Sequence, residues 1–378
     1  MTLCRLGDTA KFINGVAFKP ADWADEGLPI IRIQNLTGTG ESFNRTNRAV
    51  RPELIIEPGD LLVSWSATLD AYRWGGPRGV LNQHIFKVLP KDGVNQEYLF
   101  YALKQVIAEL ERKTHGSTMK HVVRGDFEAT RIPLPPLPEQ HRIVDLLSRA
   151  ENIVRMRREA ETKVKEFIPA LFLDMFGDPA TNPKGWEVRS VGEVIRSAEY
   201  GTSSKASADS EGIPIIRMGN VDSSGRLSLE DLKYVELLER EQRKHSLAAG
   251  DILFNRTNSK ELVGKTGIWR GPENAVAASY FIRVRVDDTV VTPDFVWAFM
   301  NSSHMKRILF STARGAIGQS NINARELRAL KILVPPIGLQ RAFADGVARA
   351  TGLERQQVVA TEQANLTLQS LLSAAFKE

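Results

Sequence analysis

The sequence predicts an α/β fold, in the broad sense that includes α+β, made of two similar tandem domains separated by two long helices. Two observations predict it. An apolar stripe at coiled-coil spacing occurs twice, with an offset of 200 positions, as between Ile143 and Phe343. Strand-like patches also recur in the same order before each stripe. We therefore expect one module of about 200 residues that is used twice.

The first long helix is predicted from Pro138 to Phe176, between a cluster of prolines and Gly177. Pro169 lies inside it and is expected to kink or split it. The stripe is apolar at both ends, and its polar centre, Arg157 and Glu161, is expected to form a cross-helix layer that fixes the register. The seam of the helix consists of Ile143, Leu147, Val154, Arg157, Glu161, Val164, Ile168 and Leu171.

The second long helix repeats the first, since its prolines and its stripe recur at the same offset. Its seam includes Phe343, Val347, Leu368 and Leu371. Two helices that share a register and are apolar at both ends suit each other as partners. The expected divisions are a first domain at 1–132, a first spacer helix at 133–179, a second domain at 180–332 and a second spacer helix at 333–378.

Each domain carries the same succession of strands and helix. In the first, strands are predicted at 28–33, 61–65 and 85–89, and a helix at 97–113. In the second, matching patches predict strands at 213–218 and 250–254 and a helix near 293–309. The offset between matching patches drifts from 185 to 200, as between Pro29 and Pro214 and between Pro135 and Pro335, which loop insertions in a duplicated unit would cause.

The composition is that of an ordinary globular protein. The chain has 378 residues, a net charge of +5 and a pI of about 9.2, a mildly basic balance that is compatible with a nucleic-acid partner. The single cysteine, Cys4, excludes an internal disulfide. Neither a signal-peptide pattern nor an apolar run of membrane-spanning length occurs, so a cytoplasmic protein is expected.

The sequence offers no convincing catalytic or metal site. Gly264, Lys265 and Thr266 lack the earlier glycine of a phosphate-binding loop, and are better explained as a turn and a strand. Asp60 and Asp251 occupy equivalent turns, where a carboxylate that accepts from local amides is a better explanation than a nuclease pair. We therefore expect the chain to perform no covalent chemistry by itself.

The chain resembles the specificity subunits of type I restriction–modification systems over nearly its whole length. The resemblance rests on the twin architecture, on Leu134–Gln140 and on Phe176–Pro179. It implies two target-recognition domains that are separated by two long antiparallel helices and that read a bipartite, gapped sequence in double-stranded DNA. It also implies two modification (adenine methyltransferase) subunits and restriction (translocase and endonuclease) subunits as partners. S-adenosylmethionine, ATP and magnesium would be bound by those partners and not by this chain.

Candidate DNA contacts are side chains that suit bases or phosphates: arginine reads guanine and asparagine or glutamine reads adenine, while lysine, arginine, serine and threonine bind phosphates. In the first domain they are Arg32, Gln34, Asn35, Ser117, Thr118, Lys120 and His121. In the second domain they are Arg217, Asn220, Asn255, Arg256, Thr257, Asn258, Lys260, Arg314, Gln319, Ser320 and Asn321.

Simpler explanations compete with these contacts. The loop residues could be merely solvated, and the strand-end residues near Asn35 and Asn220 could cap turns. Residues 64–68 are the first-domain counterpart of 255–260, and Asn82, Gln83 and His84 could also read bases. Arg155 and Arg158 are better explained as a solvated helix face.

Two rival functions stay open at this point. One is a fused nuclease or methylase, which the missing catalytic motifs disfavour. The other is a helical scaffold whose domains bind proteins and not DNA, with residues 134–138 as a polyproline ligand.

Overall fold

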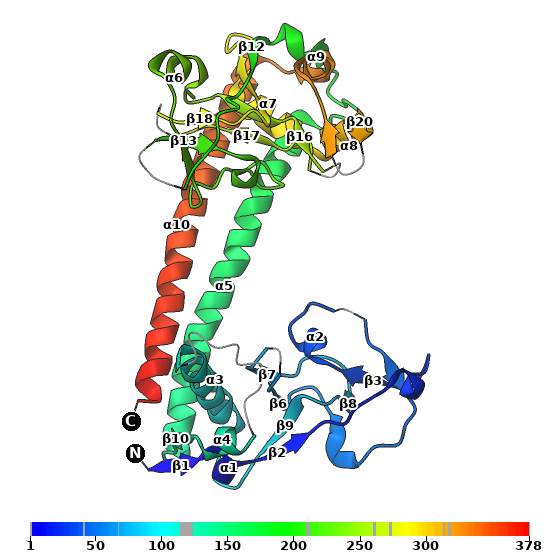
Figure 1. Ribbon diagram of the computed structural model, residues 1–378, viewed down its shortest axis with the longest axis vertical. Coiled ribbons are helices and arrows are strands. Elements are labelled where there is room, and N and C mark those ends of the chain that lie inside the picture. The colour runs from blue at the N-terminus through cyan, green and yellow to red at the C-terminus, as the bar shows by residue number, and fades with distance from the viewer. Residues whose placement is uncertain are drawn as a thin grey trace. The chain divides into compact units, whose positions relative to one another are not determined.

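The computed structural model describes residues 2–40, 42–66, 68–113, 124–208, 212–259, 262–271, 274–312, 314–316 and 319–377. Side chains are described for these ranges apart from residues 112, 113, 314–316, 319 and 320. The chain forms two compact units (Figure 1). The first consists of Met1–Arg158 with Val359–Glu378, and the second of Glu159–Val358.

The first unit is built around an antiparallel four-stranded sheet, in the order β2 (Ala10–Asn14), β9 (Ile85–Pro90), β6 (Leu61–Ser64), β7 (Asp70–Arg73). A second sheet has the order β4 (Arg45–Thr46), β3 (Leu28–Ile31), β8 (Gly79–Leu81), β5 (Ile55–Ile56). The remaining strands, β1 (Leu3–Arg5) and β10 (Arg131–Pro133), pair with each other. Its helices are α1 (Leu6–Thr9), α2 (Ile33–Leu36), α3 (Gln96–Lys113) and α4 (Arg124–Ala129), with 3-10 turns at Pro20–Asp22 and Pro52–Leu54.

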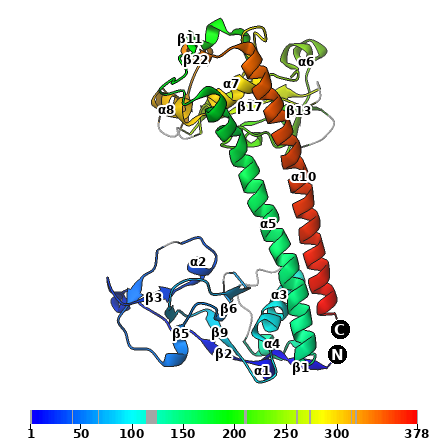
Figure 2. The same cartoon turned by 180° about the vertical axis from the view of Figure 1, so that it is seen from behind.

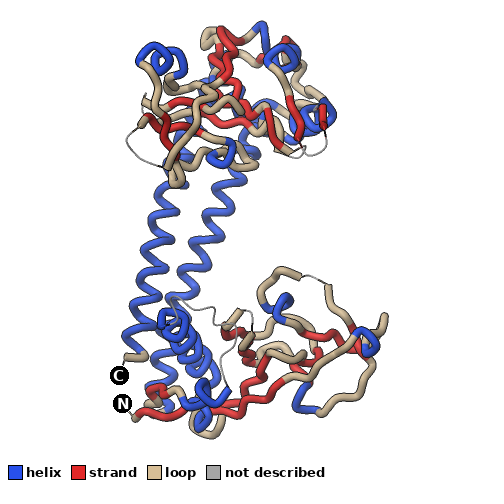
Figure 3. The backbone as a smooth tube through the Cα atoms, viewed as in Figure 1, coloured by secondary structure: helices blue, strands red, loops and turns tan. Residues whose placement is uncertain are grey.

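The second unit repeats this plan (Figure 3). Its main sheet has the order β12 (Ile195–Tyr200), β19 (Phe281–Val286), β15 (Ile252–Asn255), β17 (Thr266–Ile268). One smaller sheet has the order β14 (Lys233–Val235), β13 (Ile213–Ile216), β18 (Val276–Ala277). Another has the order β16 (Thr257–Asn258), β21 (Gln319–Asn321), β20 (Arg314–Ala316). In addition, β11 (Glu187–Ser190) pairs with β22 (Lys331–Val334). Its helices are α6 (Glu239–His245), α7 (Pro293–Met300), α8 (Ser303–Thr312) and α9 (Ala324–Ala329), with 3-10 turns at Val191–Glu193 and Met218–Asn220.

The predicted duplication is confirmed at the level of single hydrogen bonds. The N–H of Gly15 donates to the carbonyl of Ile85, and that of Gly201 donates to Phe281. Both glycines are required, because a Cβ would lie 1.9 Å from the Asn82 carbonyl oxygen at Gly15 and 2.2 Å from the Ala277 oxygen at Gly201. The two units therefore share one backbone plan, although few of their side chains match.

The two long helices, α5 (Leu137–Phe176) and α10 (Ile337–Ala375), contribute to both units. They lie side by side and run in opposite directions (Figures 1 and 2). In the first unit, Ile143 and Leu147 join a core that includes Leu368 and Phe376; in the second, Ile168 joins Phe343. All the seam residues named from the sequence are buried or half-buried. No helix in the described ranges is long and apolar enough to cross a membrane.

Two local predictions were wrong, and of the two outcomes expected at Pro169 the split of the helix does not occur. Helix α5 continues to Phe176, because Ile168 and Phe172 are buried in the second core and offset the missing hydrogen bond. The strands predicted to reach residues 33 and 218 end two residues earlier, where short helical turns begin. The helix predicted near 293–309 is two helices, since Ser302 begins a new one by accepting from the Met305 N–H.

Gln140 and Gln340 fasten each long helix to its domain by the same three hydrogen bonds. The Gln140 side chain accepts from the Asn95 N–H and donates to the carbonyls of Gly93 and Pro135. The Gln340 side chain accepts from the Thr292 N–H and donates to the carbonyls of Val290 and Pro335. Both side chains are fully buried, so water cannot replace these hydrogen bonds if the glutamine is lost.

We expect Gln140→Leu to lower the free energy of unfolding of the first unit by about 2–4 kcal/mol. The substitution leaves the Asn95 N–H and the carbonyls of Gly93 and Pro135 without their hydrogen-bond partner. Gln340→Leu should do the same to the second unit. Chemical denaturation would measure both effects. Gln369→Leu, at an exposed glutamine of α10, is the matched control and should change stability by less than about 0.5 kcal/mol. Equal effects of the buried and exposed substitutions would contradict this role.

Candidate nucleic-acid interface

A small antiparallel ribbon in the second unit brings together two segments that contain predicted DNA contacts, residues 257–258 and 319–321. Strand β16 pairs with β21, with Thr257 opposite Asn321 and Asn258 opposite Ser320. The Ile322 N–H donates to the Arg256 carbonyl at 2.9 Å and closes the end of the ribbon. A β-ribbon is one of the elements that the DNA major groove admits.

Asn255 and Arg256 lie where β15 leaves the main sheet for this ribbon. Asn255 is 0% exposed, and within the described part of the chain neither atom of its amide has a hydrogen-bond partner. The Arg256 guanidinium lies 4.8 Å from the ring centroid of Tyr200, and its Nε is buried without a partner among the described residues. Unsatisfied buried polar groups are rare in folded proteins and are often functional.

Asn35 and Asn220 cap turns, which is the simpler explanation that the sequence analysis gave beside base contacts. The Asn35 side chain accepts from the Arg32 N–H at 3.0 Å and donates to the carbonyls of Gly40 and Ser42. The Asn220 side chain accepts from the Arg217 N–H at 2.9 Å and also donates to two carbonyls of its own loop. Both amides are therefore already occupied, which argues against base contacts by these two residues.

The arginines before these caps are placed differently in the two units. Arg217 donates to the Asp231 carboxylate at 3.2 Å, whereas the Arg32 guanidinium lies 4.9 Å from the ring centroid of Trp23. Gln34 is exposed on α2. Ser117, Thr118, Lys120, His121 and Lys260 lie outside the described residues, and Arg314, Gln319 and Ser320 are described only as members of their strands.

Asp60, Asp251 and Lys265 have the structural roles that the sequence analysis preferred to catalytic ones. Asp60 accepts from the Glu57 N–H and Asp251 from the Ala248 N–H, so both carboxylates close turns. Lys265 follows a turn and precedes β17, and its Nζ donates to the carbonyls of Met218 and Val221. Burial lowers the pKa of Lys265, and nearby Asp222 opposes that effect.

The polar centre of the long helices bonds in a way that the sequence did not reveal. Arg157 and Glu161 are half-buried on the seam, as expected. Arg158 is exposed, as expected of a solvated face, and its side chain also donates to Asn365 of α10 at 3.3 Å. In the second unit Glu354 of the seam forms an ion pair with Arg226 of the domain at 3.3 Å.

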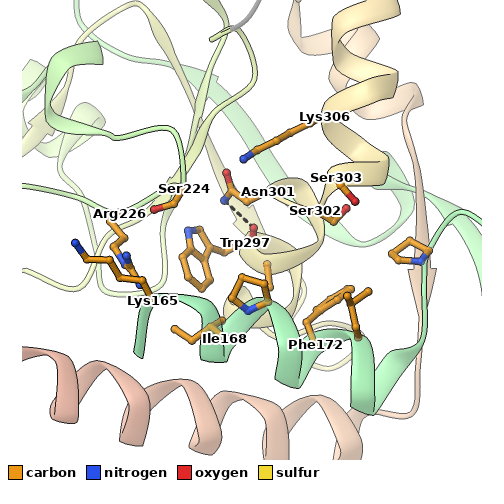
Figure 4. A pocket seen from close by; sticks show the side chains of 14 residues that line it. Lys165, Ile168, Phe172, Ser224, Arg226, Trp297, Asn301, Ser302, Ser303 and Lys306 are labelled. Atoms are coloured by element: carbon orange, nitrogen blue, oxygen red, sulfur yellow. Dashed lines mark hydrogen bonds between the residues drawn. The ribbon is translucent and has the colours of Figure 1, made fainter. Parts of the chain in front are cut away.

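A cavity of about 230 Å³ lies between α5 and the second domain (Figure 4). Its apolar wall includes Ile168, Phe172 and Trp297. Its cationic side chains include Lys165 and Lys306, and burial lowers the pKa of Lys306. This combination suits an apolar side chain that is followed by an acidic group.

Comparison with known proteins assigns the family. The family model described as "Type I restriction modification DNA specificity domain" matches residues 1–166 and again 183–357. The chain is 22% identical to the type I restriction enzyme EcoBI specificity subunit of Escherichia coli, over 98% of this chain and 84% of that one. It is 26% identical to the MjaVIII specificity subunit of Methanocaldococcus jannaschii, over 97% and 91%.

Solved structures agree in fold. The S subunit of a type I restriction–modification system from M. genitalium has a TM-score of 0.56 at 14% identity, covering 100% of this chain and 96% of that chain. A chain from a study of complex assembly and conformational transition of the type I R-M system has a TM-score of 0.62 at 18% identity, covering 99% and 97%. With two copies of the family's domain on a shared backbone plan, this chain belongs to the family of type I restriction–modification DNA specificity subunits.

Proposed function

We propose that the chain reads a bipartite, gapped sequence in double-stranded DNA, one part with each domain, while the long helices act as the spacer. The observation that carries the proposal is the duplication itself. Equivalent backbone positions, fixed by the same hydrogen bonds, carry different side chains in the two units. Divergence on a shared scaffold is what two domains need in order to read two different sequences.

The chain directs partner subunits to this sequence and does no covalent chemistry of its own. Its partners are two modification subunits, which methylate adenine, and restriction subunits that join them. S-adenosylmethionine, ATP and magnesium are bound by those partners. Such a complex acts on chromosomal DNA, in the cytoplasm.

Exposed apolar residues on the long helices support one docking surface in each unit, which the repeat relates at one position. Ile153 of α5 and Leu353 of α10 are related by the repeat, and each is 53% exposed. In the first unit Leu146 and Met156 are exposed near Ile153, and in the second unit Val358 is exposed near Leu353. Exposed apolar patches of this kind mark protein contacts. A duplicated surface fits two copies of one partner, and the cavity beside α5 offers the partner a further apolar contact.

Selection from a randomised duplex library by the chain in complex with its modification partner tests this function. We expect two short conserved blocks separated by a gap of fixed length and random sequence. Affinity should fall by about 10³-fold or more between 50 and 200 mM salt if the complex makes six or more phosphate contacts. Equal affinity for all duplexes would contradict the proposal, and a single uninterrupted block would contradict its two-domain form.

A further inference from the structure

We propose that three backbone positions in each domain form the base-reading cluster and determine which base pair that domain prefers. They are Asn14, Trp65 and His84 in the first domain, and Tyr200, Arg256 and Tyr280 in the second. The inference rests on the proposed DNA-reading function and assigns it to particular side chains. Of these six residues, Arg256 is a contact predicted from the sequence, and His84 is an alternative that the sequence also offers.

The two clusters occupy the same place on the same backbone. Asn14 ends β2 and Tyr200 ends β12, each directly before the glycine that packs against a neighbouring segment. The Trp65 N–H donates to the His84 carbonyl at 3.1 Å, and the Arg256 N–H donates to the Tyr280 carbonyl at 2.8 Å. Because neighbouring strands of these sheets are antiparallel, all three positions lie at one edge of each main sheet.

In the cluster of the second domain, the guanidinium of Arg256 is held in place by an aromatic ring. The ring of Tyr200 lies beside Arg256, and a cation–π contact of this kind fixes the direction of an arginine side chain. Tyr200 and Tyr280 are 44% and 42% exposed, so the edge is open to a ligand. An oriented guanidinium can bond O6 and N7 of guanine together. We therefore assign a G·C pair to this position of the target.

The cluster of the first domain presents an amide and an imidazole in place of the guanidinium. Trp65 donates from its indole to the Asn14 amide oxygen at 3.2 Å, and its ring contacts that of His84 at a centroid distance of 4.9 Å. His84 has a φ of 72°, which is costly for a residue other than glycine. Its Nδ1 is buried and has no partner within the described residues.

These features point to a ligand and not to stability alone. A strained backbone and unsatisfied buried nitrogens both cost free energy, and folded proteins retain such features mainly where function requires them. The clusters also differ in chemistry while the backbone around them stays constant. Identical positions with different donors and acceptors are what two domains with different targets require.

Methylation of a randomised duplex library by the complex with its modification partner tests the assignment. For Arg256→Ala we expect the preference at one base pair of one block to fall by about 10- to 100-fold, as for loss of a bidentate guanine contact. The other block and the gap should be unchanged. His84→Ala should relax one position of the opposite block. Tyr200→Leu should weaken the same preference as Arg256→Ala, but less, because the arginine stays while the ring beside it and the bond that its hydroxyl accepts from the Ala324 N–H are lost.

Controls separate this result from misfolding and from general charge loss. Arg243→Ala removes an exposed arginine of α6 that is paired with Glu239, and it should leave both blocks intact. Arg256→Lys keeps the charge but loses the paired donors, so it should relax the same position even if Arg256→Ala fails to fold. An unchanged profile for both Arg256 variants, or an even loss over all sequences, overturns the inference. Absence of any two-block preference in the wild-type complex overturns the proposed function instead.

Discussion

Ending the chain after Val358 should unfold the first unit while leaving the second one folded. The removed segment belongs to the first unit, although it lies farthest from it in the sequence. Its Leu368, Leu371 and Phe376 pack against the core that contains Tyr98, and the Phe376 and Tyr98 ring centroids are 5.2 Å apart. Full burial of such a side chain contributes about 1.5–3 kcal/mol; Phe376 is buried, and the two leucines, which are half-buried, contribute less. Their joint loss is comparable with the whole stability of many domains.

Limited proteolysis with mass spectrometry would measure this effect, through new cleavage sites within residues 1–132 and none within residues 180–332. Leu366→Ala in the full-length chain is the control, because this leucine of the same segment is exposed and should matter little. A truncated chain whose first unit stays protected would show that α10 is not part of that core.

Phe176→Ala should lower the stability of the second unit by about 3–5 kcal/mol, as expected for a fully buried phenylalanine. Phe176 ends α5, and its ring centroid lies 4.8 Å from that of Phe295 and 5.3 Å from that of Phe343. It therefore joins both long helices to the domain in one aromatic cluster. Denaturant titration followed by circular dichroism would measure the change.

Phe167→Ala provides the matched comparison, since it makes the same substitution on the same helix at a side chain that is 49% exposed. It should change the stability by less than about 1 kcal/mol. Similar losses from the two substitutions would contradict the placement of the aromatic cluster in the second core.

The sequence predicted the large-scale arrangement because hydrophobic spacing and prolines carry that information directly. The offset of 200 positions between Gln140 and Gln340 pointed to a repeat, and both glutamines make the same hydrogen bonds. The bonds themselves were not predictable, since two of the three partners of each glutamine lie on a loop more than 40 residues away in the sequence. The break before Ser303 was also missed, because a serine inside an apolar pattern does not reveal that it caps a new helix.

The sequence predicted parts of the base-reading clusters but not their membership. Residues 64–68 were matched with 255–260 and His84 was considered, whereas Asn14, Tyr200 and Tyr280 were missed. Searching for repeats finds positions where the side chains agree, whereas His84 and Tyr280 agree only in backbone contacts. The offset between Trp65 and Arg256 is 191 and that between His84 and Tyr280 is 196, because loop lengths differ between the domains.

If this chain alone decides which two-part DNA sequence its partners modify, methylation in a genome must depend on it. The test is to map methylated bases across a genome with the modification partner present and with or without this chain. We expect one gapped motif of two blocks that is methylated only when the chain is present. Methylation that is the same without the chain, or that marks an uninterrupted motif, would contradict it.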